Sequence, residues 1–212
     1  MKEKSDILFG FHSVYEALKA RKRKFFSILI SKKKASHRTD KILTIAREQR
    51  IKIEYVKPEL LDKMTHFSNH QGLAAKTSVY PVKKATEVIP FIQEKKSDCF
   101  ILVLENIEDP HNLGALIRTA LSAGVDYILI PKDRSAVPSS TVSRSSAGAM
   151  EHANIFMITN TASILRSLKE AGVWVSGLDA GGSKSLFESD LTGNIALIIG
   201  GEHKGIRPLV KK

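Results

Sequence analysis

The stretch "CFILVLENIEDPHNLGALIRTALSAGVDYILIP" (99–131) predicts a strand, a turn, a helix and a second strand. Its two ends, 99–105 and 126–131, are short apolar runs of the kind found in strands that are buried on both faces. Between them, apolar residues recur at helical spacing. This alternation of buried strand and amphipathic helix predicts an α/β fold.

Three further apolar runs, at 153–159, 172–178 and 194–200, are separated by helical or turn-rich stretches. We therefore expect a mostly parallel sheet with helices on both sides. Ligands of such sheets bind beyond the carboxyl ends of the strands. The loops after residues 105, 131, 178 and 200 are accordingly the predicted positions of a site.

The first 80 residues predict a smaller α/β unit. Its expected helices are 9–24, 38–50 and 58–64, and its expected strands are 25–31, 51–56 and 71–80. A polar connection, "PVKKA" (81–85), precedes a helical pattern at 86–96. The expected organisation is a domain at 1–80, a linker at 81–85 and a second domain at 86–212.

Composition favours a folded protein with a polyanionic partner. Of the 212 residues, 42% are hydrophobic, and 33 Lys and Arg against 22 Asp and Glu give a formal net charge of +11. Nucleic acid is the first candidate partner, although a lysine excess can also serve solubility alone. Cys99 is the single cysteine and cannot form an internal disulfide, which fits a reducing compartment. With no signal-peptide core and no apolar run near the ~18 residues that span a bilayer, we expect a cytoplasmic protein.

Basic charge is concentrated in "KARKRK" (19–24) and "SKKKASHR" (31–38), which flank one predicted strand. We expect the two runs to converge into a phosphate-binding patch, and the alternative is a solvated lysine-rich surface. The expected contacts, with two arginines from a later segment, are Arg21, Lys22, Arg23, Lys24, Lys32, Lys33, Lys34, Arg38, Arg134 and Arg144.

Within "DPHNLGALIRTA" (109–120), Asp109 and Pro110 predict a turn, and Asn112 is suited to capping the helix that follows. Arg118 lies roughly 130° from the middle of the apolar face, given ~100° per residue, and is therefore not a core residue. A capped surface helix with an exposed arginine is the alternative to a functional segment.

The segment "IALIIGGEHKGI" (195–206) predicts a buried strand that enters a glycine-rich loop. Glu202 would repel a phosphate, so the loop better suits a ligand with an adenosine and a positive centre. A plain strand–turn connection is the alternative. The seven histidines show no metal-ligand spacing, and we expect no metal site.

A segment rich in serine and other small residues, "PKDRSAVPSSTVSRSSAGAM" (131–150), leaves three possibilities open. It can form a helix packed closely against another backbone, a dimer face or an RNA-contacting loop.

Taken together, "NIEDPHNLGALIRTALSAGV" (106–125), "IPKDRSAVPSS" (130–140) and "IALIIGGEHKGI" resemble the SpoU/TrmH branch of the SPOUT RNA ribose 2'-O-methyltransferases. Within that branch, the chain is similar to rRNA guanosine 2'-O-methyltransferases of the RlmB type. The segments "FGFHSVYEAL" (9–18) and "HQGLAA" (70–75) resemble the family's L30e-like RNA-binding domain.

This resemblance implies a methyltransferase domain with a C-terminal trefoil knot, S-adenosylmethionine as the cofactor, RNA (rRNA first) as the substrate and a homodimer formed by the knot domain. It implies catalytic roles for Asn112, Arg118 and Glu202, and a cofactor-binding role for Gly177, Leu178, Ile199, Gly200 and Gly201. The family's third motif, a Ser-Leu-Asn segment expected after "GIRPLVKK", is not in this sequence. We therefore expect the C-terminal knot segment to be missing from this chain.

Two alternative functions remain open at this point. One is a tRNA 2'-O-methyltransferase. The other is a non-catalytic RNA-binding or ribosome-assembly protein with a methyltransferase-like domain. The presence of Asn112, Arg118 and Glu202 favours an enzyme.

Overall fold

A computed structural model describes residues 4–32, 37–202 and 205–211. The chain forms two compact units. The first comprises Met1–Pro81 and Pro138–His152, and the second comprises Val82–Val137 and Ala153–Lys212. No helix in the described part of the chain is long and apolar enough to cross a membrane.

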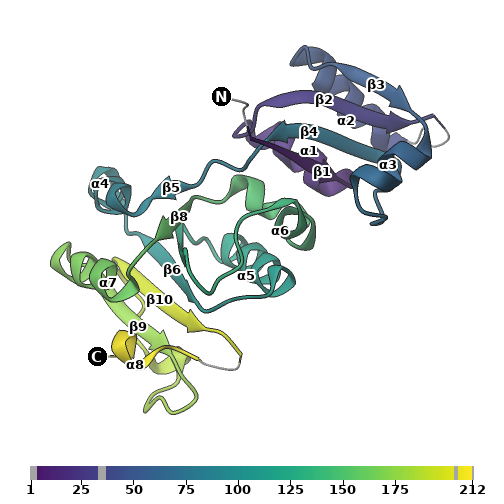
Figure 1. Ribbon diagram of the computed structural model, residues 1–212. Coiled ribbons are helices and arrows are strands. Elements are labelled where there is room, and N and C mark those ends of the chain that lie inside the picture. The colour runs from purple at the N-terminus through teal and green to yellow at the C-terminus, as the bar shows by residue number, and fades with distance from the viewer. Residues whose placement is uncertain (1–3, 33–36, 203–204, 212) are drawn as a thin grey trace. The chain divides into compact units, whose positions relative to one another are not determined.

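The first unit is built on a four-stranded mixed sheet of order β1-β4-β2-β3 (Figure 1). β4 runs antiparallel to β1 and to β2, and β2 runs parallel to β3. Its elements are β1 (Ser5–Phe9), α1 (Phe11–Ala20), β2 (Phe25–Ser31), α2 (His37–Glu48), β3 (Ile53–Val56), α3 (Pro58–Met64) and β4 (Leu73–Ser78). The strand β1 is absent from the sequence prediction because its five residues form too short an apolar run.

Alternation along the strands gives this sheet two apolar faces. Ile28 and Ile30 of β2 pack with residues of α1 and α2, whereas Leu29 packs with Leu61 of α3 on the opposite face. Successive strand side chains point to opposite sides, so a run such as "FFSILIS" can be buried on both faces.

The second unit contains a six-stranded sheet of order β5-β8-β7-β6-β10-β9 in which every neighbouring pair is parallel. The expected α/β fold with a mostly parallel sheet is confirmed. The elements are β5 (Lys83–Lys84), η1 (Ala85–Glu87), α4 (Val88–Glu94), β6 (Phe100–Glu105), α5 (Pro110–Ser122), β7 (Tyr127–Pro131), β8 (Ile155–Ile158), α7 (Thr161–Glu170), β9 (Trp174–Leu178), η3 (Leu186–Glu188), β10 (Ile195–Gly200) and α8 (Pro208–Lys211).

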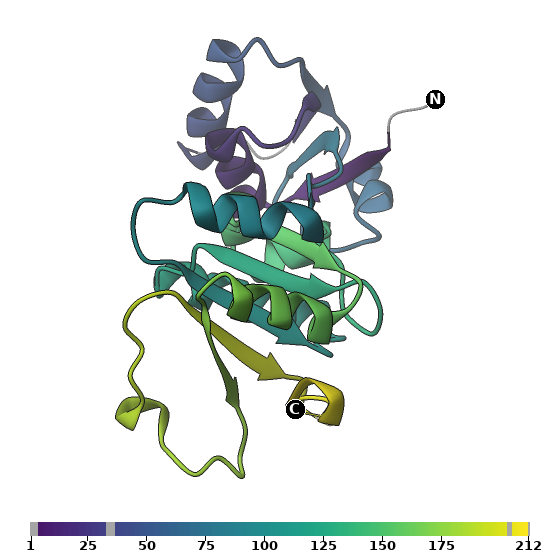
Figure 2. The ribbon, with the colours of Figure 1, turned by 90° about the vertical axis from the view of Figure 1, so that its left-hand side faces the viewer.

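Helices lie on both sides of this sheet (Figure 2). α4 and α7 pack with Ile101 and Val103 of β6 in one apolar cluster, and α5 buries Leu113 and Ile117. Cys99 is also buried in the cluster, and this burial raises the pKa of its thiol to about 11. From β6 the chain continues outward to β7 and β8, and β10 lies on the other side of β6. The strand order therefore reverses between β6 and β10, where ligands of such sheets bind.

The predicted linker at 81–85 is not a free connection. Lys83 and Lys84 form β5 and pair with Phe156 and Met157 of β8. The Lys83 ammonium lies 3.8 Å from the centre of the Phe91 ring, a cation–π contact. This part of the prediction is wrong because two residues are enough to add an edge strand to a sheet.

Residues 138–152 were expected to belong to the second domain, but they pack with the first unit. This stretch forms α6 (Ser140–Ser145) and η2 (Ala149–His152). Gly148, at φ +83°, leaves no room for a side chain, since a Cβ would lie 2.6 Å from the His12 carbonyl oxygen. Of the three possibilities for the serine-rich segment, close packing against another backbone is the one observed here.

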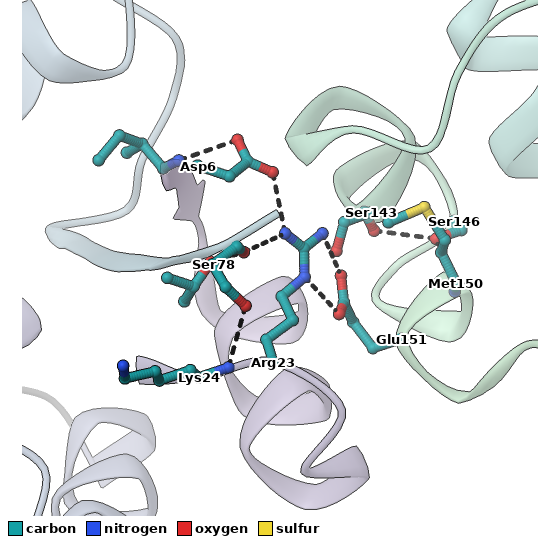
Figure 3. A network of polar contacts seen from close by, with 10 residues as sticks. Asp6, Arg23, Lys24, Ser78, Ser143, Ser146, Met150 and Glu151 are labelled. Carbon is teal, nitrogen blue, oxygen red and sulfur yellow. Dashed lines mark hydrogen bonds and ion pairs between the residues drawn. The ribbon is translucent and has the colours of Figure 1, made fainter. Parts of the chain in front are cut away.

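A buried charge network joins this stretch to the first unit (Figure 3). The Arg23 guanidinium donates to both carboxylate oxygens of Glu151, at 2.8 and 3.0 Å, and also to Asp6 at 2.9 Å and to the Ser78 carbonyl at 3.1 Å. Arg23 is 5% exposed and Glu151 is fully buried. Arg23 is therefore a correction to the predicted phosphate patch, because its charge is used inside the fold.

We predict that Arg23→Ala lowers the free energy of unfolding by about 3–5 kcal/mol, because it leaves the buried Glu151 carboxylate without a counter-charge. Urea unfolding of the whole protein, monitored by circular dichroism, measures the change in free energy. Arg21→Ala is the control, since Arg21 is exposed two residues away and should shift the free energy by less than about 0.5 kcal/mol. Equal losses in the two variants would contradict the prediction.

Candidate active site

A cleft of about 590 Å³ lies beyond the carboxyl ends of β6 and β10, at the point where the strand order reverses. Two of the four loops singled out from the sequence, those after residues 105 and 200, form it. The cleft is lined by Asn106, Ile107, Glu108, Asp109, Asn112, Ala115, Leu116, Ile199, Gly200, Gly201 and Glu202. Its volume is typical of small-molecule sites.

Asn112 and Glu202 meet in this cleft although 90 residues separate them in the sequence. The Asn112 side-chain amide donates a hydrogen bond of 2.8 Å to the Glu202 carboxylate. Asn112 does not cap α5, contrary to the prediction. Pro110 is the first helical residue, so the capping position is Asp109, whose carboxylate accepts from the His111 N–H at 2.7 Å. The Asn112 amide is consequently free of a capping role and points to Glu202.

Arg118 does not line the cleft. It lies six residues beyond Asn112 on α5, which places it about 120° away around the helix axis. Its side chain is exposed, and in the described part of the chain it makes no hydrogen bond or ion pair. The structure therefore brings Asn112 and Glu202 together and leaves Arg118 on a neighbouring face of α5.

Gly200 and Gly201 permit a close approach between backbone segments. A Cβ on Gly200 would lie 2.1 Å from the Gly205 carbonyl carbon, and one on Gly201 would lie 2.2 Å from the Asn106 carbonyl oxygen. The Gly201 N–H donates to the Glu105 carbonyl, and the Gly205 N–H donates to the Gly201 carbonyl, both at 2.8 Å. These glycines are therefore required for the loop itself, before any ligand is considered.

The five predicted cofactor residues line two cavities. Ile199, Gly200 and Gly201 line the cleft described above, whereas Gly177 and Leu178 line a cavity of about 580 Å³ formed by residues 176–191. The two sets lie on adjacent strands, because Leu178 of β9 is paired with Ile199 of β10. Ile206 lies between them, and its Cδ1 would be 3.0 Å from a Cβ on Gly177.

Among the described residues, the basic side chains of the two runs do not meet. Arg21, Lys22 and Lys24 precede β2 and Lys32 follows it, so a strand of seven residues, roughly 20 Å at ~3.3 Å per residue, separates them. The prediction that they meet at one strand end is wrong, because residues that precede and follow a strand lie at its two opposite ends. Arg21, Lys24 and Lys32 are exposed, and the partly buried Lys22 donates to the His152 carbonyl at 2.8 Å.

The other predicted basic contacts have mixed outcomes. Arg134 and Arg144 are exposed, and the Arg144 guanidinium lies 5.1 Å from the centre of the Phe9 ring. Lys33 and Lys34 lie outside the described residues, as does the side chain of Arg38. Among the residues that the structure describes, no group of three or more metal-ligating side chains gathers.

The fold and cleft are those of an α/β protein with a ligand-sized site at a topological switch point. Residues 99–212 match the SpoU rRNA Methylase family, and residues 7–82 match the family described as RNA 2'-O ribose methyltransferase substrate binding. The chain belongs to the SpoU family of RNA 2'-O-ribose methyltransferases.

Individual relatives cover most of the chain. YacO, a TrmH family protein of Bacillus subtilis, is 35% identical over all 212 residues, which span 84% of YacO. The 23S rRNA (guanosine-2'-O-)-methyltransferase RlmB of Xanthomonas campestris is 36% identical over 87% of this chain and 74% of its own length. The AdoMet-bound rRNA methyltransferase of Sinorhizobium meliloti has the same fold, with a TM-score of 0.76 at 21% identity over 96% of this chain and 73% of that one.

Sequence reasoning missed one group of residues at this site. Glu105 is fully buried at the end of β6, and its neighbour Asn106 is buried at φ +57° while lining the cleft. A charged residue that directly ends an otherwise apolar strand is the signal that could have identified Glu105.

We predict that Gly201→Ala destabilises the second unit by about 1–3 kcal/mol and separates Glu202 from Asn112, because the new methyl group collides with rigid backbone. Gly181→Ala is the matched control, since its Cβ would meet only the Asp179 carboxylate at an ordinary 3.4 Å. Chemical denaturation of both variants measures the difference. A Gly201→Ala protein as stable as Gly181→Ala would show that the close approach is not required.

Proposed function

We propose that this protein transfers a methyl group from S-adenosylmethionine to the ribose 2'-hydroxyl of a guanosine in large-subunit rRNA. The observation that supports this most strongly is the hydrogen bond between Asn112 and Glu202 in the cleft at the switch point. It joins two polar side chains from the segments that define the family resemblance.

The residues of the cleft fit S-adenosylmethionine chemically. Ile107, Leu116 and Ile199 provide apolar surface for an adenosine, and the exposed Glu202 carboxylate provides negative charge for a cationic sulfonium. Gly200 and Gly201 expose backbone without side chains. Ile199, Gly200 and Gly201, with Gly177 and Leu178 on the adjacent strand, are the residues we propose to hold the cofactor.

S-adenosylmethionine, when bound, supplies an electrophilic methyl group on a positively charged sulfur. The protein then has two tasks, to align the ribose 2'-oxygen with that methyl group and to assist loss of the hydroxyl proton. Asn112 orients the Glu202 carboxylate through their hydrogen bond. A carboxylate held in one orientation can fix a cationic group or a hydroxyl in the cleft.

For Arg118 we propose an electrostatic role. Arginine retains its positive charge in proteins and is a poor proton acceptor. Its exposed guanidinium, which has no acidic partner in the described part of the chain, is available to bind an RNA phosphate beside the cleft. The charge would then stabilise the alkoxide that develops on the 2'-oxygen. A lysine at this position would keep the positive charge and lose the planar donor fork, so Arg118→Lys tests whether the fork is needed.

The substrate assignment rests on the relatives and on the first unit. RlmB proteins of several bacteria, 31–36% identical to this chain, are described as 23S rRNA (guanosine-2'-O-)-methyltransferases. The residues matched to RNA substrate binding, 7–82, include the exposed cations Arg21, Lys24 and Lys32. We further propose that the second unit mediates a homodimer.

We predict that Arg118→Ala lowers kcat/KM for RNA methylation by at least about 100-fold, as expected for loss of one transition-state electrostatic contact. Arg118→Lys should also retain little activity, because lysine lacks the planar donor fork of arginine. Transfer of a tritiated methyl group from S-adenosylmethionine to 23S rRNA measures both, and filter binding gives the RNA affinity. The affinity should stay within about two-fold of wild type, because Arg118 is one contact among many.

Arg166→Ala is the matched control, since Arg166 is an exposed arginine on α7 outside the cleft. It should methylate at the wild-type rate. Arg118→Ala activity equal to that of Arg166→Ala would contradict the proposed role. Absence of methyl transfer by the wild-type protein to 23S rRNA would overturn the proposed function, and transfer to tRNA instead would favour the alternative substrate.

A further inference from the structure

Glu105, the last residue of β6, is a fully buried carboxylate beside the cleft. Burying a charge is costly unless oppositely charged and hydrogen-bonding groups surround it. An apolar residue at this strand end would pack without that cost. The carboxylate must therefore make contacts that an apolar side chain could not.

Those contacts come from two separate parts of the second unit. The Arg207 Nε–H donates to Oε1 of Glu105, and the hydroxyl of Thr161, the first residue of α7, donates to Oε2 at 2.8 Å. Arg207 also donates to the Thr161 hydroxyl at 3.3 Å. Thr161 is 1% exposed. The three side chains form a closed set in which both carboxylate oxygens have a donor.

The backbone of Glu105 also contacts Gly201, the residue that precedes Glu202. The Gly201 N–H donates to the Glu105 carbonyl at 2.8 Å. Glu105 thus contacts Gly201, the residue before Glu202, through its backbone and Arg207 through its side chain.

The chain that leaves Glu105 leads directly to Asn112. Asn106 follows at φ +57°, and its side-chain amide lies 3.4 Å from the Gly205 carbonyl, where it donates a long hydrogen bond. Six residues, 106–111, connect Glu105 to Asn112 in the first turn of α5. Glu105 therefore contacts or directly precedes both segments that supply the cleft side chains, Asn112 and Glu202.

We propose that Glu105 is a positioning residue for methyl transfer, which sets the Glu202 carboxylate against Asn112 through its contacts with Gly201 and Arg207. The expected fall in kcat rests on the proposed function, RNA methylation. The geometric consequence, the Asn112–Glu202 hydrogen bond, is measurable in the protein alone.

The test compares Glu105→Gln with Glu151→Gln. Both remove the charge of a fully buried carboxylate that pairs with an arginine, but Glu151 lies in the first unit and outside the cleft. The proton–nitrogen NMR signal of the Asn112 side-chain amide, assigned with Asn112→Ala, reports the hydrogen bond. Glu202→Ala gives the position of that signal when the bond is absent.

In Glu105→Gln the Asn112 signal should move toward its position in Glu202→Ala, and kcat should fall about 10-fold or more while KM for RNA changes less than about two-fold. In Glu151→Gln the Asn112 signal and kcat should stay as in wild type, even if the unfolding midpoint falls as much as in Glu105→Gln. If Glu105→Gln does not fold, Arg207→Lys provides the same test from the partly exposed partner, whose side chain is 40% exposed.

Two results would overturn the proposal: an unchanged Asn112 signal and kcat in folded Glu105→Gln, or the same changes in Glu151→Gln, which would indicate general destabilisation. A wild-type protein that transfers no methyl group would defeat the proposed function, while the NMR comparison would still decide whether Glu105 positions Glu202.

Discussion

The close backbone contact between the end of β6 and the corner that follows β10 is the constraint on which the rest of the site depends. β6 and β10 are parallel neighbours, and Gly200 is in register with Glu105. Only residues without a Cβ fit at Gly200 and Gly201, because the Asn106 and Gly205 backbones occupy that space. This contact brings the start of α5 and the loop after β10, which are distant in the sequence, to one cleft. There Asn112 and Glu202 meet.

Much of this arrangement could be predicted from the sequence because it follows from local patterns. The buried runs from 99–105 to 194–200 predict parallel strands, and parallel strands place their following loops at one edge of the sheet. Asn112, Glu202 and the glycines were accordingly expected near one another. The residue that caps α5 could not be predicted in the same way. The capping position is the one before the first helical residue, and because Pro110 is that first residue, the cap is Asp109.

One prediction that failed, the surface role of Arg23, depends on a contact between residues distant in the sequence. The role of Arg23 is decided by Glu151, 128 residues away, and no local pattern distinguishes it from the exposed Arg21. The basic runs failed to meet for a local reason, because residues 21–24 and Lys32 lie at opposite ends of β2. A cluster of cations in a sequence is thus divided by the fold into charges that stabilise the protein and charges that remain at the surface.

We propose that the cleft between the ends of β6 and β10 is the cofactor site of this SpoU-family protein. Titration of S-adenosylmethionine into the nitrogen-15-labelled protein tests it most directly. The backbone amide signals of Ile199, Gly200 and Gly201, with those of Gly177 and Leu178, should shift together with one dissociation constant. Shifts confined to the first unit, or none at saturating cofactor, would contradict the claim.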